Sequence, residues 1–463
     1  MAQAPHEVVV LGAGIVGLCT AYYTLSLDPA AKVTLVEAAR GTIAPGASSF
    51  AGGFLAFGTA WHEPPSQPLA RLSGACHADL AERLEGDQRW GYRQCSAIGL
   101  NVGGVDEDRS KYRTLPGGKK EGRKEGEGGR LPRGEWVEGE KEVLSTEGGV
   151  AQLDPAAFCM TLHEHLSTTY ADRFTTIFGR ATALSPPNGH HARAGSSPKR
   201  TITILPHAAD TSTSSSRPSP ISVALDRLVI AAGPWSAAVC STLGLPPIPL
   251  TNLPGHSLLI RPSLSGYSPH PGTTTLPSQA VFAGISGAVG GVHASTSGLA
   301  RGLTPEEKAE GFTRSPEFFV RTNGLVYVAG ENTIPETRAQ RLEGLPNKLP
   351  ESADEVREMI DERLVGRLKR AAGAVSPLLK EENGAVVERQ QFCYRPIAPD
   401  REPIIGLLDP SDPTVYVSTA KGPWGITLAP GAGKVVAELL LGLDPSADIS
   451  ALSPRRFAAK AKL

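Results

Sequence analysis

The architecture of this 463-residue chain is set by residues 8–17, which read Val8-Val9-Val10-Leu11-Gly12-Ala13-Gly14-Ile15-Val16-Gly17. An apolar strand runs into a GxGxxG loop, and an apolar helix over Ile15–Leu27 follows directly. The next strand, Val33–Glu37, ends in an acidic residue about 20 positions after the last glycine, the spacing at which a carboxylate binds a ribose hydroxyl in dinucleotide-binding domains. This context favours a nucleotide site. A structural glycine turn in an unrelated α/β domain is the alternative.

The glycines of the motif have separate physical roles. Gly12 permits a tight turn, Gly14 lets a pyrophosphate approach the backbone, and Gly17 lets the helix pack on the strand. The free N–H groups and the positive dipole of the helix start also attract phosphates. The residues expected at the nucleotide are therefore Gly12, Gly14, Ile15, Val16, Gly17, Glu37 and Ala38.

Composition narrows the class of protein. The chain holds 46 Lys and Arg against 47 Asp and Glu, and this balance argues against a binder of nucleic-acid phosphates or a basic membrane-surface protein. Its 6 cysteines are sparse and lack C-x-x-C spacing, so we expect neither disulfides nor a metal site. The apolar stretch 8–25 is broken by glycines, so we expect no membrane span. The first expected strand begins within the first eight residues, and no basic segment precedes it, so we expect no signal peptide.

Strands and helices should alternate along most of the chain. Expected strands are Val8–Leu11, Val33–Glu37, Arg227–Ala231, Ser257–Ile260, Leu325–Ala329 and Val415–Ser418. Expected helices are Ile15–Leu27, Leu69–Leu84, Pro155–Leu166, Ser352–Ala371 and Gly431–Leu441. Residues 117–130 contain only Gly, Lys, Arg and Glu and should form a solvated loop. Thr201–Leu205 alternates like a strand and should pair with Ile221–Leu225.

Five further segments carry a resemblance to a known family. They are the small-residue loop Gly46–Gly53, the segment Leu228–Ser236, the segment Cys393–Asp400, the run Pro403–Gly406 and the stretch Gly425–Gly431. Together with the glycine motif they resemble the D-amino-acid-oxidase-like flavoprotein superfamily, in the branch of glycine and sarcosine oxidases and bacterial D-amino-acid dehydrogenases. Gly52-Gly53-Phe54-Leu55-Ala56, with Trp61-His62 and Trp90-Gly91-Tyr92-Arg93, looks closer still to little-characterised fungal oxidoreductases of that superfamily.

The resemblance implies an α/β fold: a discontinuous Rossmann-type FAD-binding domain plus a mixed-sheet α+β substrate domain. It places residues 1–75, 150–250 and 385–463 in the FAD-binding domain and residues 76–103 and 251–384 in the substrate domain. Residues 104–149 and 186–220 are then largely loop insertions. Beyond the motif, it implies FAD contacts from Ser48, Ser49, Ala232, Gly233, Trp235, Gly422, Trp424, Gly425, Ile426 and Thr427.

Relatives of this kind oxidise a C–N bond of a small amine or amino acid by hydride transfer to FAD. The resemblance makes Arg395 a clamp for a substrate carboxylate, with a brace for the flavin or a loop as the alternative. His256 falls near the flavin face and is either a substrate contact or a core histidine. Lys421 either stabilises the negative charge of the reduced flavin or promotes its reaction with oxygen, and the alternative is a lysine that faces solvent. Glu331 lies near the flavin ring or is structural.

Cys393 occupies the position at which sarcosine oxidases link a sulfur to the flavin. The alternative is a buried thiol that behaves as a small hydrophobe, since many relatives have a small residue there.

The chain ends in Ala461-Lys462-Leu463, a conservative variant of the Ser-Lys-Leu address of peroxisomal proteins. We therefore expect the peroxisomal import receptor as a partner and oxygen as the electron acceptor. The cytoplasm or an endosome-associated position is the alternative location. The rival functions are a flavin-binding protein of membrane trafficking with little catalysis and an amine dehydrogenase that uses another acceptor.

Overall fold

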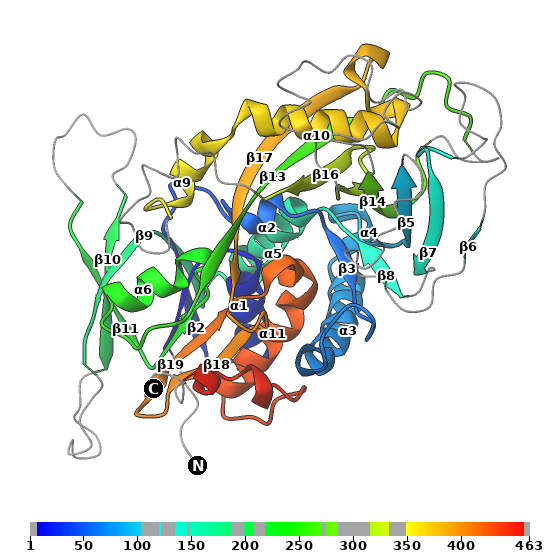
Figure 1. Ribbon diagram of the computed structural model, residues 1–463. Coiled ribbons are helices and arrows are strands. Elements are labelled where there is room, and N and C mark those ends of the chain that lie inside the picture. Colours follow the sequence, from blue (N-terminus) through cyan, green and yellow to red (C-terminus); the bar gives the residue numbers. More distant parts are fainter. Residues whose placement is uncertain are drawn as a thin grey trace.

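The computed structural model describes residues 7–102, 120–121, 135–145, 149–186, 199–207, 218–269, 275–285, 315–332 and 349–457. Two large β-sheets lie beside each other, and helices cover them (Figure 1). A small third sheet is formed by β3 (Phe54–Ala56), β8 (Val150–Gln152) and β4 (Arg93–Gln94).

The first sheet has the strand of the glycine motif at its centre. Strands β9, β2, β1, β12 and β19 run parallel in this order. β10 adds to β9, β11 to β10 and β18 to β19 by antiparallel pairing, so β11 and β18 are the edge strands. The central strands are nearly continuous runs of buried aliphatic residues, as a parallel sheet covered on both faces requires. The bounds are β1 Glu7–Leu11, β2 Lys32–Glu37, β9 Phe174–Leu184, β10 Arg200–Pro206, β11 Ile221–Leu225, β12 Arg227–Ile230, β18 Ile404–Asp409 and β19 Asp412–Thr419.

Helices from opposite ends of the sequence pack on this sheet. α1 (Ile15–Leu27) lies against α11 (Gly425–Leu440), and α3 (Gln67–Arg83) packs on the far side of α11 (Figure 1). A Cβ at Gly433 would lie 2.6 Å from the backbone of Cys19, so glycine permits the close approach of α1 and α11. α5 (Pro155–Thr169) begins at Asp154, whose carboxylate accepts from the N–H groups of Ala156 and Ala157.

The second sheet is mixed. Its order is β17-β13-β16-β15-β14-β5-β7-β6, and α10 (Glu362–Val375) covers one face (Figure 1). The apolar side of α10 buries Val365, Leu368 and Val375 against this sheet. The bounds are β5 Ser96–Val102, β6 Lys120–Glu121, β7 Glu140–Ser145, β13 Thr251–Arg261, β14 Gln279–Ile285, β15 Glu317–Val320, β16 Val326–Glu331 and β17 Val386–Ile397.

This architecture confirms the expected fold class. The first sheet is assembled from segments far apart in sequence, and the antiparallel pairing of β10 with β11 is the expected meander. Two proposed boundaries differ from the structure. α3 runs unbroken through the proposed boundary after residue 75, and the predicted insertion 104–149 contributes β7 and the buried Trp136 and Val137 to the second sheet. Most of residues 117–130 lies outside the described residues.

Two predicted helices were wrong in their limits. The predicted helix Ser352–Ala371 is instead α9 (Ala353–Val356), a 3-10 turn and α10, because Ile360 is extended and Asp361 caps the new helix at Arg363. α11 begins at Gly425 rather than Gly431, since neighbouring side chains accommodate Pro430 within the helix.

All six cysteines are buried and free. Within the described ranges, no helix is both long and apolar enough to cross a bilayer, and no group of three or more His, Cys, Asp or Glu side chains is placed to hold a metal ion. The C-terminal tripeptide, Ala461–Leu463, lies outside those ranges.

Candidate active site

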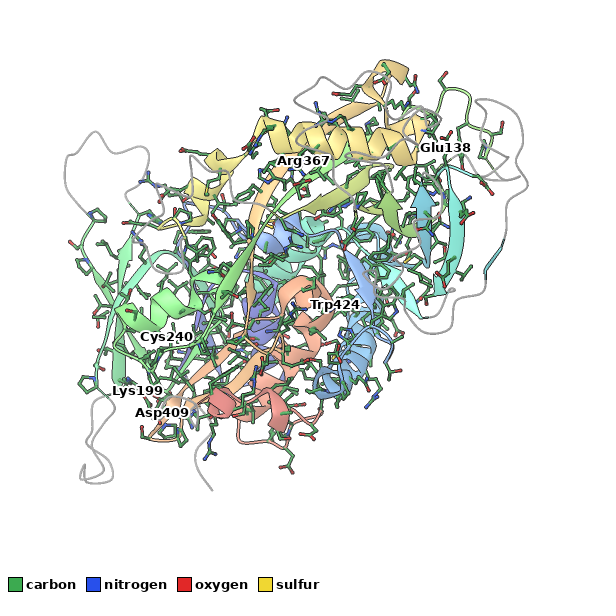
Figure 2. The ribbon with its side chains drawn as sticks, viewed as in Figure 1. Glu138, Lys199, Cys240, Arg367, Asp409 and Trp424 are labelled. Carbon is green, nitrogen blue, oxygen red and sulfur yellow. The ribbon has the colours of Figure 1, made fainter. Side chains whose placement is uncertain are left out.

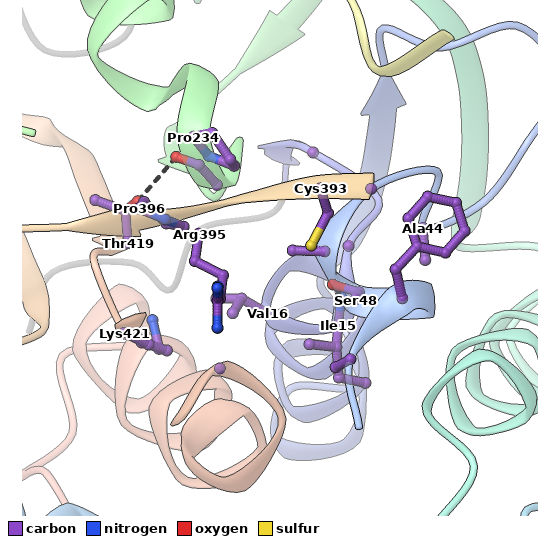
Figure 3. Close-up of a pocket in the computed structure, with 18 of the residues that line it drawn as sticks. Ile15, Val16, Ala44, Ser48, Pro234, Cys393, Arg395, Pro396, Thr419 and Lys421 are labelled. Carbon is purple, nitrogen blue, oxygen red and sulfur yellow. Dashed lines mark hydrogen bonds between the residues drawn. The ribbon is translucent and has the colours of Figure 1, made fainter. Parts of the chain in front are cut away.

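A cavity of about 610 Å³ lies between the two large sheets. One wall is formed where β1, β2, β12 and β19 end, the edge at which parallel α/β sheets bind ligands. The opposite wall comes from the second sheet and includes Cys393 and Arg395 of β17 (Figure 3). The cavity therefore combines the glycine motif with the segments identified by resemblance.

The glycine loop forms a cradle that larger residues would fill. Gly12 has φ 109°, and a Cβ there would overlap the backbone carbonyl of Ala231. A Cβ at Gly14 would lie 3.0 Å from the Ser48 hydroxyl, and one at Gly17 would overlap the Gly12 carbonyl. Gly12 and Gly14 line the cavity, whereas Gly17 supports the loop from behind.

The first turn of α1 faces the cavity with little side-chain capping. Gly14 is the N-cap and supplies no side chain, while the Ile15 N–H donates to Ser48 Oγ at 3.0 Å. Ile15, Val16 and Ser48 line the cavity, and Ser49 does not. The helix start thus presents N–H groups and a positive dipole to a phosphate.

Glu37 ties the strand end of β2 to the glycine loop. Its carboxylate accepts from the Ala13 N–H and the Ala39 N–H, each at 2.9 Å. Burial raises the pKa of Glu37, and these backbone hydrogen bonds oppose that shift. Both Glu37 and Ala38 line the cavity, so the acidic residue stands where the motif predicts.

Two Gly-Pro-Trp turns follow parallel neighbours of the sheet. Gly233–Trp235 follows β12 and Gly422–Trp424 follows β19, and each begins with a glycine at φ 53°. Both turns line the cavity, as do Ala232, Gly425 and Ile426. Trp424 lies between α11 and β3 (Figure 2), with its ring 6.2 Å from that of Trp61. Thr427 is buried in α11 and does not line the cavity.

Lys421 is a buried lysine beside the second of these turns. Its side chain projects into the cavity (Figure 3), and its Nζ donates to Ser418 Oγ at 2.9 Å. No carboxylate lies within 4.0 Å of it among the described residues. Burial lowers the pKa of Lys421 to about 7, so the solvent-facing alternative is wrong.

Arg395 projects into the same space as Lys421 and Val16 (Figure 3). Its Nη2 donates to Asn332 Oδ1 and to the Pro254 carbonyl at 3.4 Å, and its buried Nε has no hydrogen-bond partner among the residues that the structure describes. Gly255 makes room for it, since a Cβ there would lie 2.5 Å from Nη2. The guanidinium is held in place on one side and keeps donors available to a ligand.

His256 also lines the cavity, but its ring has structural contacts. Its Nε2 accepts from the Asp361 N–H at 3.1 Å, and the ring packs on Phe392 at 4.6 Å. Burial lowers the pKa of His256 to about 4, so the ring is neutral at physiological pH. Glu331 forms an ion pair of 3.4 Å with Arg367 of α10 (Figure 2) and does not line the cavity.

The Cys393 thiol points into the cavity toward the start of α1 and Ser48 (Figure 3). Burial raises its pKa, and Arg395 opposes the shift. The position is compatible with either a link to a flavin or a packed free thiol.

Sequence reasoning missed Glu317 and the aromatic residues around it. Glu317 begins β15, is partly buried and lines the cavity beside Phe282 and Phe319. The Phe319 ring stacks on Tyr327 at 5.7 Å and on Phe54 at 5.4 Å. The available signal was the short strand-like segment Glu-Phe-Phe-Val at residues 317–320. Because successive side chains of a strand point to opposite faces, Glu317 and Phe319 lie on the same face.

These residues fit a flavin dinucleotide. The glycine cradle and the α1 start suit a pyrophosphate, and the carboxylate of Glu37 at the end of β2 suits a ribose hydroxyl. The turn at Gly422–Trp424 leads into the N-terminus of α11. Arg395, Cys393 and the aromatic residues lie on the opposite wall, where a ring system and a substrate have room.

Comparisons with known proteins agree with this assignment. The family described as DAO, FAD dependent oxidoreductase, matches residues 7–439. A protein of Schizosaccharomyces pombe that is named as an oxidoreductase is 27% identical over 465 residues, covering 97% of this chain and 98% of the relative.

Solved structures share the fold across the whole chain. Iminodiacetate oxidase from Chelativorans sp. BNC1 is 17% identical, with TM-score 0.61 and coverage of 96% of this chain and 98% of that one. Glycine oxidase from Geobacillus kaustophilus is 16% identical, with TM-score 0.61 and coverage of 97% and 99%. The chain therefore belongs to the DAO family of FAD-dependent oxidoreductases, and its cofactor is FAD.

Proposed function

We propose that this protein oxidises a C–N bond of an amino acid or secondary amine to the imine. Arg395 carries the proposal, because its guanidinium enters the cavity opposite the glycine cradle and its Nε has no partner within the described part of the chain. Guanidinium geometry suits a carboxylate, which accepts two parallel hydrogen bonds. FAD, when bound, takes the hydride that leaves the substrate carbon.

The protein residues orient the substrate and exclude water. Arg395 fixes the carboxylate end, and the aromatic side chains Phe282, Phe319 and Tyr327 give the rest of the substrate an apolar wall. An apolar wall that excludes water lowers the local dielectric constant and so strengthens the electrostatic contacts of the bound substrate. The N-terminus of α11 favours negative charge at the edge of the cavity near Gly425.

We also propose oxygen as the electron acceptor and the peroxisome as the location. Lys421 supports the first proposal, since its protonated form in the cavity would stabilise negative charge that develops during electron transfer to oxygen. The terminal Ala461-Lys462-Leu463 supports the second, and the peroxide product of an oxidase suits that compartment.

A visible spectrum of the purified protein tests cofactor and chemistry together. We expect a flavin spectrum that an amino acid or secondary amine bleaches without air and that air restores. A flavin spectrum that no amine bleaches would favour a flavin-binding protein with little catalysis. A spectrum that amines bleach but that air restores only slowly would favour a dehydrogenase. Colour kept in an acid-precipitated pellet would indicate a Cys393 link, and colour released into the supernatant would contradict it.

Arg395→Ala tests the clamp. Loss of a charge-assisted pair should raise KM for a carboxylate substrate on the order of a hundredfold and change kcat much less. Arg389→Ala is the matched control, because Arg389 lies exposed on the same strand, β17. An unchanged KM in Arg395→Ala, or an equal rise in both variants, would refute the clamp.

A further inference from the structure

Glu317 is an acidic group in the cavity to which the proposed function gives no role. It is partly buried, and it has no hydrogen bond or ion pair within 4.0 Å among the described residues. Keeping an unpaired carboxylate in such a site costs free energy, which a ligand of opposite charge offsets. Unpaired charges of this kind concentrate at functional sites.

The position of Glu317 is fixed by the sheet. It pairs with Phe282 of β14 on one side and with Ala329 of β16 on the other. Side chains of directly paired residues lie on the same face, so Glu317, Phe282 and Phe319 form one patch of the cavity wall. The rings of Phe282 and Phe319 are 5.8 Å apart, and the Trp61 ring is 5.7 Å from that of Phe282.

A carboxylate beside aromatic rings is suited to one type of ligand group. Aromatic faces attract alkylammonium groups, and a desolvated carboxylate adds the counter-charge. A neutral or anionic group would leave the charge of Glu317 without a counter-charge. The same wall therefore favours a cation at this patch.

Arg395 lies apart from this patch on the same wall. The strand order places β16 and β13 between β15 and β17, so roughly three strand spacings of about 4.8 Å separate the two backbones. Arg395 still acts on Glu317, since it lowers the pKa that burial raises. The cavity thus carries a positive and a negative group that do not form an ion pair with each other.

We propose that Glu317, with Phe282 and Phe319, binds a cationic alkylammonium group of the substrate, separated along the molecule from the carboxylate at Arg395. The inference rests on the proposed function for the presence of a carboxylate-bearing substrate in this cavity. It narrows the substrate class to amphoteric molecules whose cation lies several bonds from the carboxylate.

The test is a binding titration of the FAD-loaded protein that needs no turnover. The probes are trimethylammonio-alkanoates with two to six methylenes, whose quaternary nitrogen has no lone pair and yields no imine. Each is compared with the alkanoate that has a tert-butyl group in place of the cation. Binding is followed by the change in the flavin absorbance spectrum.

At least one cationic probe should bind the wild-type protein about tenfold more tightly than its tert-butyl counterpart, and Glu317→Gln should remove that preference. The variant should keep its affinity for the tert-butyl probe. Phe282→Leu should weaken the cationic probe alone by about threefold, the loss of one ring face. Glu388→Gln is the matched control, an exposed carboxyl of β17 paired with Arg261.

Equal affinities of wild type for every probe pair would overturn the proposal. An unchanged preference for the cationic probe in Glu317→Gln would also overturn it. An equal loss of affinity for the cationic and the tert-butyl probe would do the same, because it would mean that Glu317 only shapes the cavity. A Glu317-dependent preference without oxidation of any amine would sink the proposed function and leave this site standing.

Discussion

At the scale of single residues, Lys421 shows how the fold perturbs a charge. The side chain is 5% exposed, and its ammonium has one hydroxyl partner, Ser418. Burial lowers its pKa to about 7, against about 10.4 for a lysine in water. Between these values the unfolded chain binds more protons than the folded protein, so the stability contributed at this site rises with pH.

Lys421→Met should therefore stabilise the FAD-free protein most below pH 7, on the order of a few kcal/mol, with the gain shrinking toward pH 10. Urea unfolding at pH 6 and pH 9.5 measures the difference. Lys32→Met is the control, because Lys32 is exposed on β2. A gain of the same size at both pH values would show that the charge of Lys421 carries no cost.

Residues of the cofactor wall were predictable, and residues of the opposite wall were mostly not. Gly12 and Glu37 belong to a local motif whose spacing fixes their positions in space. Glu317 sits on a short strand, and its paired neighbours Phe282 and Ala329 come from other strands. Only the pairing of these strands brings them together, and no local pattern encodes it.

At the scale of elements, α11 holds a proline in its interior. Pro430 has no N–H, so the Ile426 carbonyl lacks its partner within the helix. His77 of α3 replaces it, with Nε2 at 3.1 Å from that carbonyl. Burial lowers the pKa of His77 to about 4, which keeps the ring neutral. The neighbouring Gly431 N–H donates to Ser73 Oγ at 3.1 Å, so α3 completes the hydrogen bonding of α11.

A double-mutant cycle tests this repair. His77→Phe should cost roughly 1–3 kcal/mol, because it leaves the Ile426 carbonyl buried and unpaired. In a Pro430→Ala background the cost should be smaller, since the backbone of that variant supplies the missing N–H. Thermal or urea unfolding of the four proteins gives the coupling. If His77→Phe lowers the free energy of unfolding equally in the wild-type and Pro430→Ala proteins, His77 contributes by packing only.

The same contacts explain which helix limits could be predicted. α1 was predicted correctly as Ile15–Leu27, because its start and apolar run are local signals. α11 was predicted to start after Pro430, since the donors from α3 lie in a distant part of the sequence. The break before α10 likewise depends on the Asp361 N–H, which donates to His256 of β13.

At the scale of the whole molecule, the FAD site joins the two large sheets. Gly12 and Lys421 come from the first sheet, Cys393 and Arg395 from the second. Outside the cavity, Arg321 at the end of β15 links them by an ion pair of 3.3 Å to Asp154 at the start of α5. Its Nη2 also donates to the Ala51 carbonyl at 2.9 Å. We therefore expect ligand binding and the cohesion of the sheets to be coupled.

FAD should stabilise both sheets as one unit. A ligand at about 100 times its Kd adds roughly 2.7 kcal/mol to the folded state, so removing FAD should lower Tm by several degrees. Calorimetry should show a single transition that shifts to higher temperature as FAD is titrated into the FAD-free protein. Two transitions, only one of which moves, would mean that the second sheet unfolds independently, and the walls of the cavity would then not depend on each other. Arg321→Met removes both the ion pair with Asp154 and the hydrogen bond to the Ala51 carbonyl, so the two sheets of this variant should unfold in two separate transitions more readily than those of the wild-type protein.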